Sequence, residues 1–209
     1  MELRLIFCLL WALLATANAV SLWPHSCYQG VLGKSSVARR CNWDENSCLT
    51  VQEENTLGGV VNTGILQACG YNMRSLEGDL DFEFGGGVYV RVHSEICRET
   101  NCNTGEKKER PKISTVPNGG QCPSCFAPGS HRCLQNVTLH CQGAANHCVD
   151  VVGTLSENNV EIPFAARGCA TQDVAKIKAG DILVSGVFTY RIKSIQLSPA
   201  PRTETVDDF

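Results

Sequence analysis

The clearest pattern along the chain is an alternation of polar and apolar residues on both sides of a glycine run. Residues 79–84 alternate acidic with apolar side chains, residues 85–87 are glycines, and residues 88–93 are rich in β-branched and aromatic side chains. A period of two places successive side chains on opposite faces of a strand, and glycines permit a tight reversal. The pattern therefore predicts a β-hairpin over residues 79–93.

Three further segments show strand patterns on either side of a short turn. Strands joined in this way pair as hairpins, and none of the stretches between cysteines favours a helix. The sequence therefore predicts an all-β fold. The three segments are 49–68 with a turn near 55–59, 149–168 with a turn near 156–159, and 182–197 with a turn near 185–186.

The first 19 residues have the pattern of a cleaved secretory signal. Arg4 precedes an apolar run over residues 5–14, and small residues ending at Ala19 follow that run. A basic start, an apolar centre and a small-residue end are typical of a signal peptide. We expect cleavage after Ala19.

The remaining sequence shows no pattern of a membrane anchor. No apolar stretch after residue 19 approaches the roughly 18 residues that a spanning helix needs. Residues 202–209 are polar, whereas a GPI signal requires a hydrophobic tail. We therefore expect a secreted, extracellular protein without a membrane anchor.

The cysteine content fits an oxidising compartment. Of the 13 cysteines, Cys8 lies in the expected signal, so an even set of 12 remains, as a fully disulfide-bonded secreted framework requires. The formal net charge of −3 and the pI near 5.9 exclude a strongly basic nucleic-acid binder.

The cysteine spacing reveals an internal repeat with an offset of 100 residues. Such a repeat indicates two tandem copies of one module, each with six cysteines. Cys41, Cys48 and Cys69 recur as Cys141, Cys148 and Cys169. We expect a signal peptide over 1–19, a first domain over 20–103, a linker over 104–121, a second domain over 122–198 and a polar tail over 199–209.

The cysteine motifs at the end of the first copy and the start of the second resemble those of the urokinase receptor and lymphocyte-antigen family. Residues 97–103 read Cys-Arg-Glu-Thr-Asn-Cys-Asn and resemble the closing signature of that family. Cys122, Cys125 and Cys133 resemble its opening cysteines. The resemblance implies two tandem disulfide-rich three-finger domains of the snake-toxin type.

The family pattern also implies a disulfide pairing. Spacing alone leaves 15 connectivities open for each set of six cysteines. By resemblance, the bonds join Cys27 to Cys48, Cys41 to Cys69, Cys97 to Cys102, Cys122 to Cys148, Cys125 to Cys133, and Cys141 to Cys169. In that pattern the last finger, residues 170–197, has no covalent clasp, and we expect it to be the most mobile segment.

Several residues suggest chemistry that a simpler interpretation also explains. Cys122 and Cys125 could form a redox dithiol, but no βαβ pattern surrounds them. His131, His140 and His147 lie near cysteines, yet oxidation of those cysteines would leave scattered imidazoles rather than a zinc site. Motifs of hydrolases and of phosphate-binding loops are absent from the sequence. We expect no catalytic residues, no metal site, no cofactor and no enzymatic activity.

An acidic strand face is the candidate binding site. Asp79, Asp81 and Glu83 follow one another with period two, so they share one face. This face is either simply solvated or steers a cationic partner. Asn136 begins an Asn-Val-Thr sequon, which predicts N-glycosylation of an exposed loop.

Three aromatic residues could serve as binding anchors or as packed residues. They are Trp23, Trp43 and Tyr71. We interpret them as core or sheet-edge residues.

The absence of a catalytic pattern predicts a protein-binding module. Two tandem three-finger domains behind a signal peptide resemble the secreted gamma-type inhibitors of phospholipase A2, which implies inhibition by protein contact. The alternative is a cell-recognition or adhesion ligand, because residues 27–30 and the Ile96-Cys97 pair resemble the neutrophil and testis or sperm surface antigens of the family. The partner would be an extracellular protein, either a secreted phospholipase A2 or a cell-surface receptor. The sequence leaves its identity, the contacting finger and the oligomeric state open.

Overall fold

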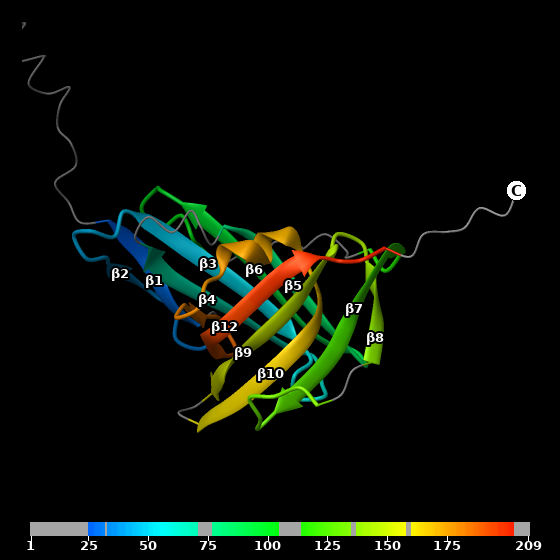
Figure 1. Ribbon diagram of the computed structural model, residues 1–209. Helices are drawn as coiled ribbons and strands as arrows, with labels where there is room; N and C mark the ends of the chain where they lie inside the picture. Colours follow the sequence, from blue (N-terminus) through cyan, green and yellow to red (C-terminus); the bar gives the residue numbers. More distant parts are fainter. Residues whose placement is uncertain are drawn as a thin grey trace, which may run out of the picture.

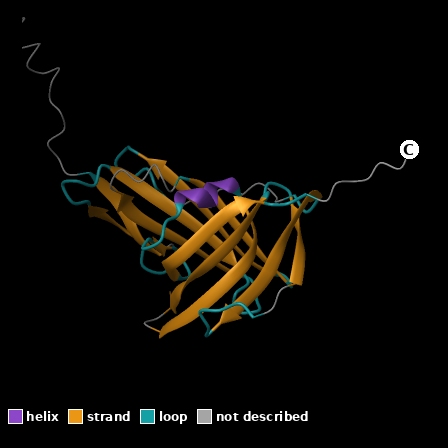
Figure 2. Cartoon of the chain, in the orientation of Figure 1, coloured by secondary structure: helices purple, strands orange, loops and turns teal. Residues whose placement is uncertain are grey.

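A computed structural model describes residues 25–31, 33–70, 77–104, 114–134, 137–157 and 160–202. The expected signal peptide, Trp23, Tyr71 and Asn136 lie outside the described residues. Within the described ranges the chain is almost entirely β, with one short 3₁₀ helix (Figure 2). The all-β prediction is therefore confirmed.

The first domain contributes six strands and the second contributes six strands and the helix η2. The elements are β1 (Ser26–Val31), β2 (Val37–Arg40), β3 (Ser47–Asn55), β4 (Asn62–Gly70), β5 (Gly78–Gly85), β6 (Val88–Cys97), β7 (Pro117–Pro128), β8 (Val137–Gln142), β9 (His147–Glu157), β10 (Val160–Ala170), η2 (Gln172–Lys176), β11 (Ile182–Val184) and β12 (Thr189–Pro199).

All four predicted hairpins are present. They are β3–β4, β5–β6, β9–β10 and β11–β12, each antiparallel. We call β5–β6 and β11–β12 the third fingers of the two domains. Strand β7 begins at Pro117, inside the segment 104–121 that we expected to be a linker.

The two domains share one continuous sheet (Figure 1). The order β11-β12-β9-β10-β5-β6-β3-β4-β1-β2 crosses from one domain to the other where β10 pairs with β5, and β7 and β8 extend the sheet from β10. At that junction Ala170 lies opposite Phe82, and Cys169 lies opposite Glu83. A sheet that continues through both domains fixes their relative placement.

Glycine and hydroxyl side chains make the junction possible. A Cβ at Gly168 would overlap the carbonyl oxygen of Glu83, so the backbones approach this closely because the residue is glycine. Thr171 accepts from the Asp81 N–H at 3.2 Å, and Ser124 Oγ donates to the Phe84 carbonyl at 2.6 Å. These bonds satisfy backbone groups where the two domains meet.

One hydrophobic core spans both domains. Leu80, Phe84 and Val90 of the first domain are buried in the same cluster as Phe164 and Tyr190 of the second. Nearly all of β3 is buried on both faces, because the second domain covers the face that a half-exposed antiparallel strand would present to water. The two domains therefore stabilise each other by burial.

The helix η2 was not predicted from the sequence. It follows β10 directly, and the side chains of Val174 and Ile177 are almost fully buried beside β5. Lys176 also donates from Nζ to the Glu77 carbonyl at 2.8 Å. No helix among the described residues is long and apolar enough to cross a bilayer.

Candidate functional site

Six disulfides consume the twelve cysteines of the described chain. They join Cys27–Cys48, Cys41–Cys69, Cys97–Cys102, Cys122–Cys148, Cys125–Cys133 and Cys141–Cys169, with Cα separations of 5.3 to 6.1 Å. Cys122 and Cys125 are thus bonded to other partners and not to each other. The sulfur atoms that lie close together in each domain are bonded in pairs and offer no thiolate to a metal. Non-reducing peptide mapping is the chemical test of this pairing.

Asn103, the last residue of the closing motif, forms hydrogen bonds that hold the first domain together. This side chain is 4% exposed. Its Nδ2 donates to the carbonyls of Tyr28 and Leu49 at 2.9 and 3.1 Å, and its Oδ1 accepts from the Tyr28 N–H at 2.9 Å. One amide therefore ties the end of the domain to its first and third strands.

The three predicted acidic residues line one groove. Asp79, Asp81 and Glu83 of β5 border a groove of about 620 Å³. Tyr89 and Arg91 of β6 lie on the same groove. Its other wall comes from the second domain and the segment before it, through Ser114, Thr115, Gln142, Ala144, Ala145 and Thr171.

Carboxylates dominate the charge of this acidic groove. Glu54 also lines it and faces Arg91, whose Nη1 is 3.2 Å from Glu54 Oε1. The Arg91 guanidinium lies 4.0 Å from the centre of the Tyr89 ring, a cation–π arrangement. His93 contacts Asp79 at 2.8 Å. The groove therefore attracts cationic side chains.

Burial shifts two ionisations in the acidic groove. It raises the pKa of the Glu83 carboxyl, and the nearby Arg91 partly opposes this rise. Burial, followed by the hydrogen bond to Glu54, raises the pKa of the Tyr89 hydroxyl. Because desolvation disfavours the charged carboxylate, a cation that enters beside Glu83 would stabilise it.

Sequence reasoning missed a second polar cluster, centred on Glu53. This side chain lies on the opposite face of β3 from Glu54 and is 2% exposed. The hydroxyls of Ser185 and Tyr190 donate to its two oxygens, and the Phe188 N–H donates at 3.3 Å. We call these residues the Glu53 clamp. It binds the third finger of the second domain to the middle strand of the first.

The Glu53 clamp left no trace in the sequence. Glu53 and Glu54 are adjacent and chemically identical, whereas the donors lie more than 130 residues away. Burial, together with the charge of Glu53 and the hydrogen bond to it, raises the pKa of the Tyr190 hydroxyl well above its ordinary value. The clamp is a structural contact between the domains.

The interpretation of Trp43 as a core or sheet-edge residue is wrong. It lies in the loop between β2 and β3 and is 84% exposed. The neighbouring strand β2 is exposed along its whole length, including Arg39 and Arg40. A short strand at the edge of the sheet has no layer to cover it.

Comparisons with known proteins identify two copies of one family model. The u-PAR/Ly-6 domain matches residues 21–105 and 118–196. A gamma-type phospholipase A2 inhibitor chain of Laticauda semifasciata is 25% identical over 152 residues, which is 68% of this chain and 78% of that protein.

Two further relatives match over shorter shares of their length, and one solved structure aligns over most of its chain. The urokinase plasminogen activator surface receptor of Bos taurus is 38% identical over 76 residues, 35% of this chain and 22% of the receptor. Ly6/PLAUR domain-containing protein 4 of Mus musculus is 29% identical over 126 residues, 54% of this chain and 51% of the relative. The crystal structure of mouse TEX101 aligns with a TM-score of 0.32 and 19% identity, covering 79% of this chain and 88% of that one.

Proposed function

Because the chain belongs to the u-PAR/Ly-6 domain family, we propose that it is a secreted protein-binding module that inhibits a phospholipase A2 by direct contact. The observation that carries this proposal is the match to the gamma-type phospholipase A2 inhibitor of Laticauda semifasciata over 152 residues. A match of that length is longer than either domain, so it includes parts of both.

The acidic groove is the contact surface in this proposal. It lies where residues of both domains meet, and carboxylates of Glu54, Asp79, Asp81 and Glu83 line it. A cationic surface on a phospholipase A2 would be steered toward this groove. Occupation of the groove would hold the enzyme away from its lipid substrate.

The direct test is hydrolysis of vesicles by a secreted phospholipase A2. The chain is produced by secretion from cultured cells, so that the disulfides form, and is added in molar excess to the enzyme on neutral phosphatidylcholine vesicles. We expect slower hydrolysis and a complex on a sizing column. An unchanged rate together with no complex would contradict the proposal.

A triple variant tests the acidic groove. Asp79→Asn, Asp81→Asn and Glu83→Gln together remove three negative charges from it, and we expect inhibition to be lost. The matched control removes three exposed charges elsewhere, through Asp44→Asn, Glu99→Gln and Glu161→Gln, and should still inhibit. Equal loss in both variants would show that net charge, and not the groove, is responsible.

A cell-recognition ligand is the second candidate function. The match to the urokinase plasminogen activator surface receptor of Bos taurus, at 38% identity, favours it. We expect labelled protein to bind a responsive cell type saturably, with competition by unlabelled protein and without effect on phospholipase activity. Binding that does not saturate would argue against this candidate.

A further inference from the structure

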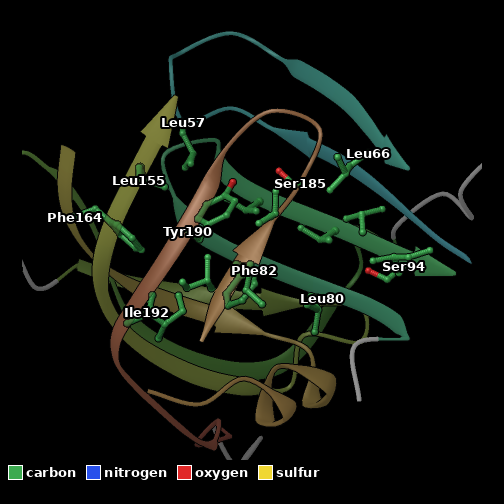
Figure 3. A pocket seen from close by; sticks show the side chains of 18 of the residues that line it. Leu57, Leu66, Leu80, Phe82, Ser94, Leu155, Phe164, Ser185, Tyr190 and Ile192 are labelled. Carbon is green, nitrogen blue, oxygen red and sulfur yellow. The ribbon is translucent and has the colours of Figure 1, made fainter. Parts of the chain in front are cut away.

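An apolar cavity of about 220 Å³ lies between the two domains. Leu80 and Phe82 of β5 point into it from the first domain, and Leu155, Phe164, Tyr190 and Ile192 point into it from the second (Figure 3). One wall of the cavity therefore comes from strands of the first domain, and the other wall comes from strands of the second. This cavity is separate from the acidic groove, although Phe82 lines both.

The inner end of the cavity is closed and apolar. Leu80, Phe84, Val90 and Phe164 line it and are at most 5% exposed. Unfilled apolar space of this kind forfeits packing contacts of the lining atoms. Water is a poor occupant, because a buried water needs two to four polar partners.

The outer end of the cavity opens beside β11. Ile182 and Val184 of this strand line the cavity and are 52% and 48% exposed. Leu66 and Ala68 of β4, both partly exposed, also line it. β11 is a three-residue strand at the edge of the sheet. The rim is therefore apolar and in contact with water.

The lining polar groups give little for a polar ligand to bind. Hydroxyls line the cavity at Ser94, Ser185 and Tyr190, and those of Ser185 and Tyr190 already donate to Glu53. A peptide inserted here would leave its backbone N–H and C=O groups without partners, at a cost in free energy. An occupant without hydrogen-bonding groups along its length incurs no such cost.

The volume fits a slender apolar chain. Apolar cavities of about 150 Å³ stay dry and admit benzene, so a space of about 220 Å³ can admit a hydrocarbon segment of about nine carbons. Because one end is closed and the other meets water, the occupant should be apolar at one end and polar at the other.

We propose that this cavity binds the terminal part of a single long acyl chain, with its methyl end near Phe164, and that the rest of the chain leaves along the apolar rim beside Ile182 and Val184 toward its polar head. Free fatty acids and lysophospholipids share this chemistry. The site is independent of the proposed inhibition of phospholipase A2, since binding is measured without any enzyme.

Binding of cis-parinaric acid, a fluorescent fatty acid, tests the proposal on the full secreted chain. We expect a saturable rise in fluorescence at one molecule per chain, below the concentration at which the probe forms micelles. Oleate and lysophosphatidylcholine are the two competitors. Displacement by one, the other or both identifies which polar heads the rim accepts, and failure of wild-type protein to bind the probe saturably overturns the proposal.

Rim variants show whether binding occurs in this cavity. Val184→Arg places a charge at an exposed rim position and should weaken probe binding at least tenfold. Ala68→Phe narrows the same opening without a charge and should also weaken it. Val160→Arg is the control, because Val160 is 60% exposed on β10 outside the cavity, and its affinity should equal that of wild type. Unchanged affinity in both rim variants, or equal weakening in the control, overturns the assignment.

Discussion

Both third fingers contact strand β3 through a tyrosine–glutamate hydrogen bond, and the two bonds differ in their burial. Tyr89 in the finger β5–β6 donates to Glu54 at 2.8 Å on one face of β3, and Tyr190 in the finger β11–β12 donates to Glu53 on the other. The first pair is partly exposed and the second is buried. Two adjacent glutamates of one strand therefore perform a surface role and an interdomain role.

The fingers also differ in how they are closed. The disulfide Cys97–Cys102 begins at the last residue of β6, whereas no disulfide lies within residues 170–197. In the second domain, buried Val174 and Ile177 and the Glu53 clamp take that place. The two fingers therefore differ in that one is followed by a covalent bond and the other is fixed by buried contacts.

The largest effect should come from breaking the Glu53 clamp. Glu53→Ala leaves the buried Tyr190 hydroxyl and the Asn55 amide without the acceptor that Glu53 provides. Ser185 and Phe188 then keep only the hydrogen bonds that they make to each other, so we expect a loss of about 3–5 kcal/mol in the free energy of unfolding. Urea denaturation with the disulfides intact measures it.

The neighbouring residue is the matched control for the clamp. Glu54→Ala breaks a partly exposed pair with Arg91 and should cost less than about 1 kcal/mol. Equal losses of unfolding free energy in the two variants would mean that the buried tyrosine–glutamate pair stabilises the fold no more than the partly exposed pair does.

The next largest effect should come from Ile177, the buried residue that follows η2 in the third finger of the second domain. Ile177 is 2% exposed, so Ile177→Ala leaves a cavity and should cost about 3 kcal/mol. Hydrogen exchange should also become faster in β11 and β12. Gln172→Ala, at an exposed position of the helix that precedes Ile177, should change stability by less than about 0.5 kcal/mol. A comparable loss there would argue that the burial of Ile177 is not responsible.

Removing the covalent clasp of the first third finger should cost less. Cys97 and Cys102 are separated by 5 residues, and a loop this short removes little entropy from the unfolded chain. Because loop-closure entropy sets the effect, the double variant Cys97→Ala and Cys102→Ala should lose about 2 kcal/mol. Calorimetry of this double variant and of Ile177→Ala shows whether the disulfide or the buried side chain stabilises the fold more. If the disulfide variant loses more than Ile177→Ala, packing is not an equal substitute for the clasp.

Local patterns predicted the elements, and long-range contacts escaped prediction for a physical reason. Alternation around residues 85–87 and around 156–159 is set by neighbours in the sequence, and it predicted the hairpins. The pairing of β10 with β5 and the clamp on Glu53 depend on residues more than 80 positions apart, which leave no periodic signal. The sequence brought Asp79, Asp81 and Glu83 to one face, yet it gave no sign that the second domain completes their groove. Trp43 was misinterpreted because aromatic character alone does not show which layer covers a loop.

The smallest effect is a difference in pH dependence between the two tyrosines. Burial, together with Glu53, raises the pKa of Tyr190 well above its ordinary value of 10.0, so the folded state keeps its proton where the unfolded state releases it. The contribution to stability is full below pH 10 and is lost as the pH rises toward the folded-state pKa. Relative to Tyr190→Phe, wild type should lose about 1 kcal/mol more between pH 9 and pH 11. Tyr89, whose pKa burial also raises, is more exposed, and Tyr89→Phe should change that slope less. If Tyr89→Phe changes the slope of stability against pH more than Tyr190→Phe does, the prediction that Tyr190 is the more strongly desolvated tyrosine is wrong.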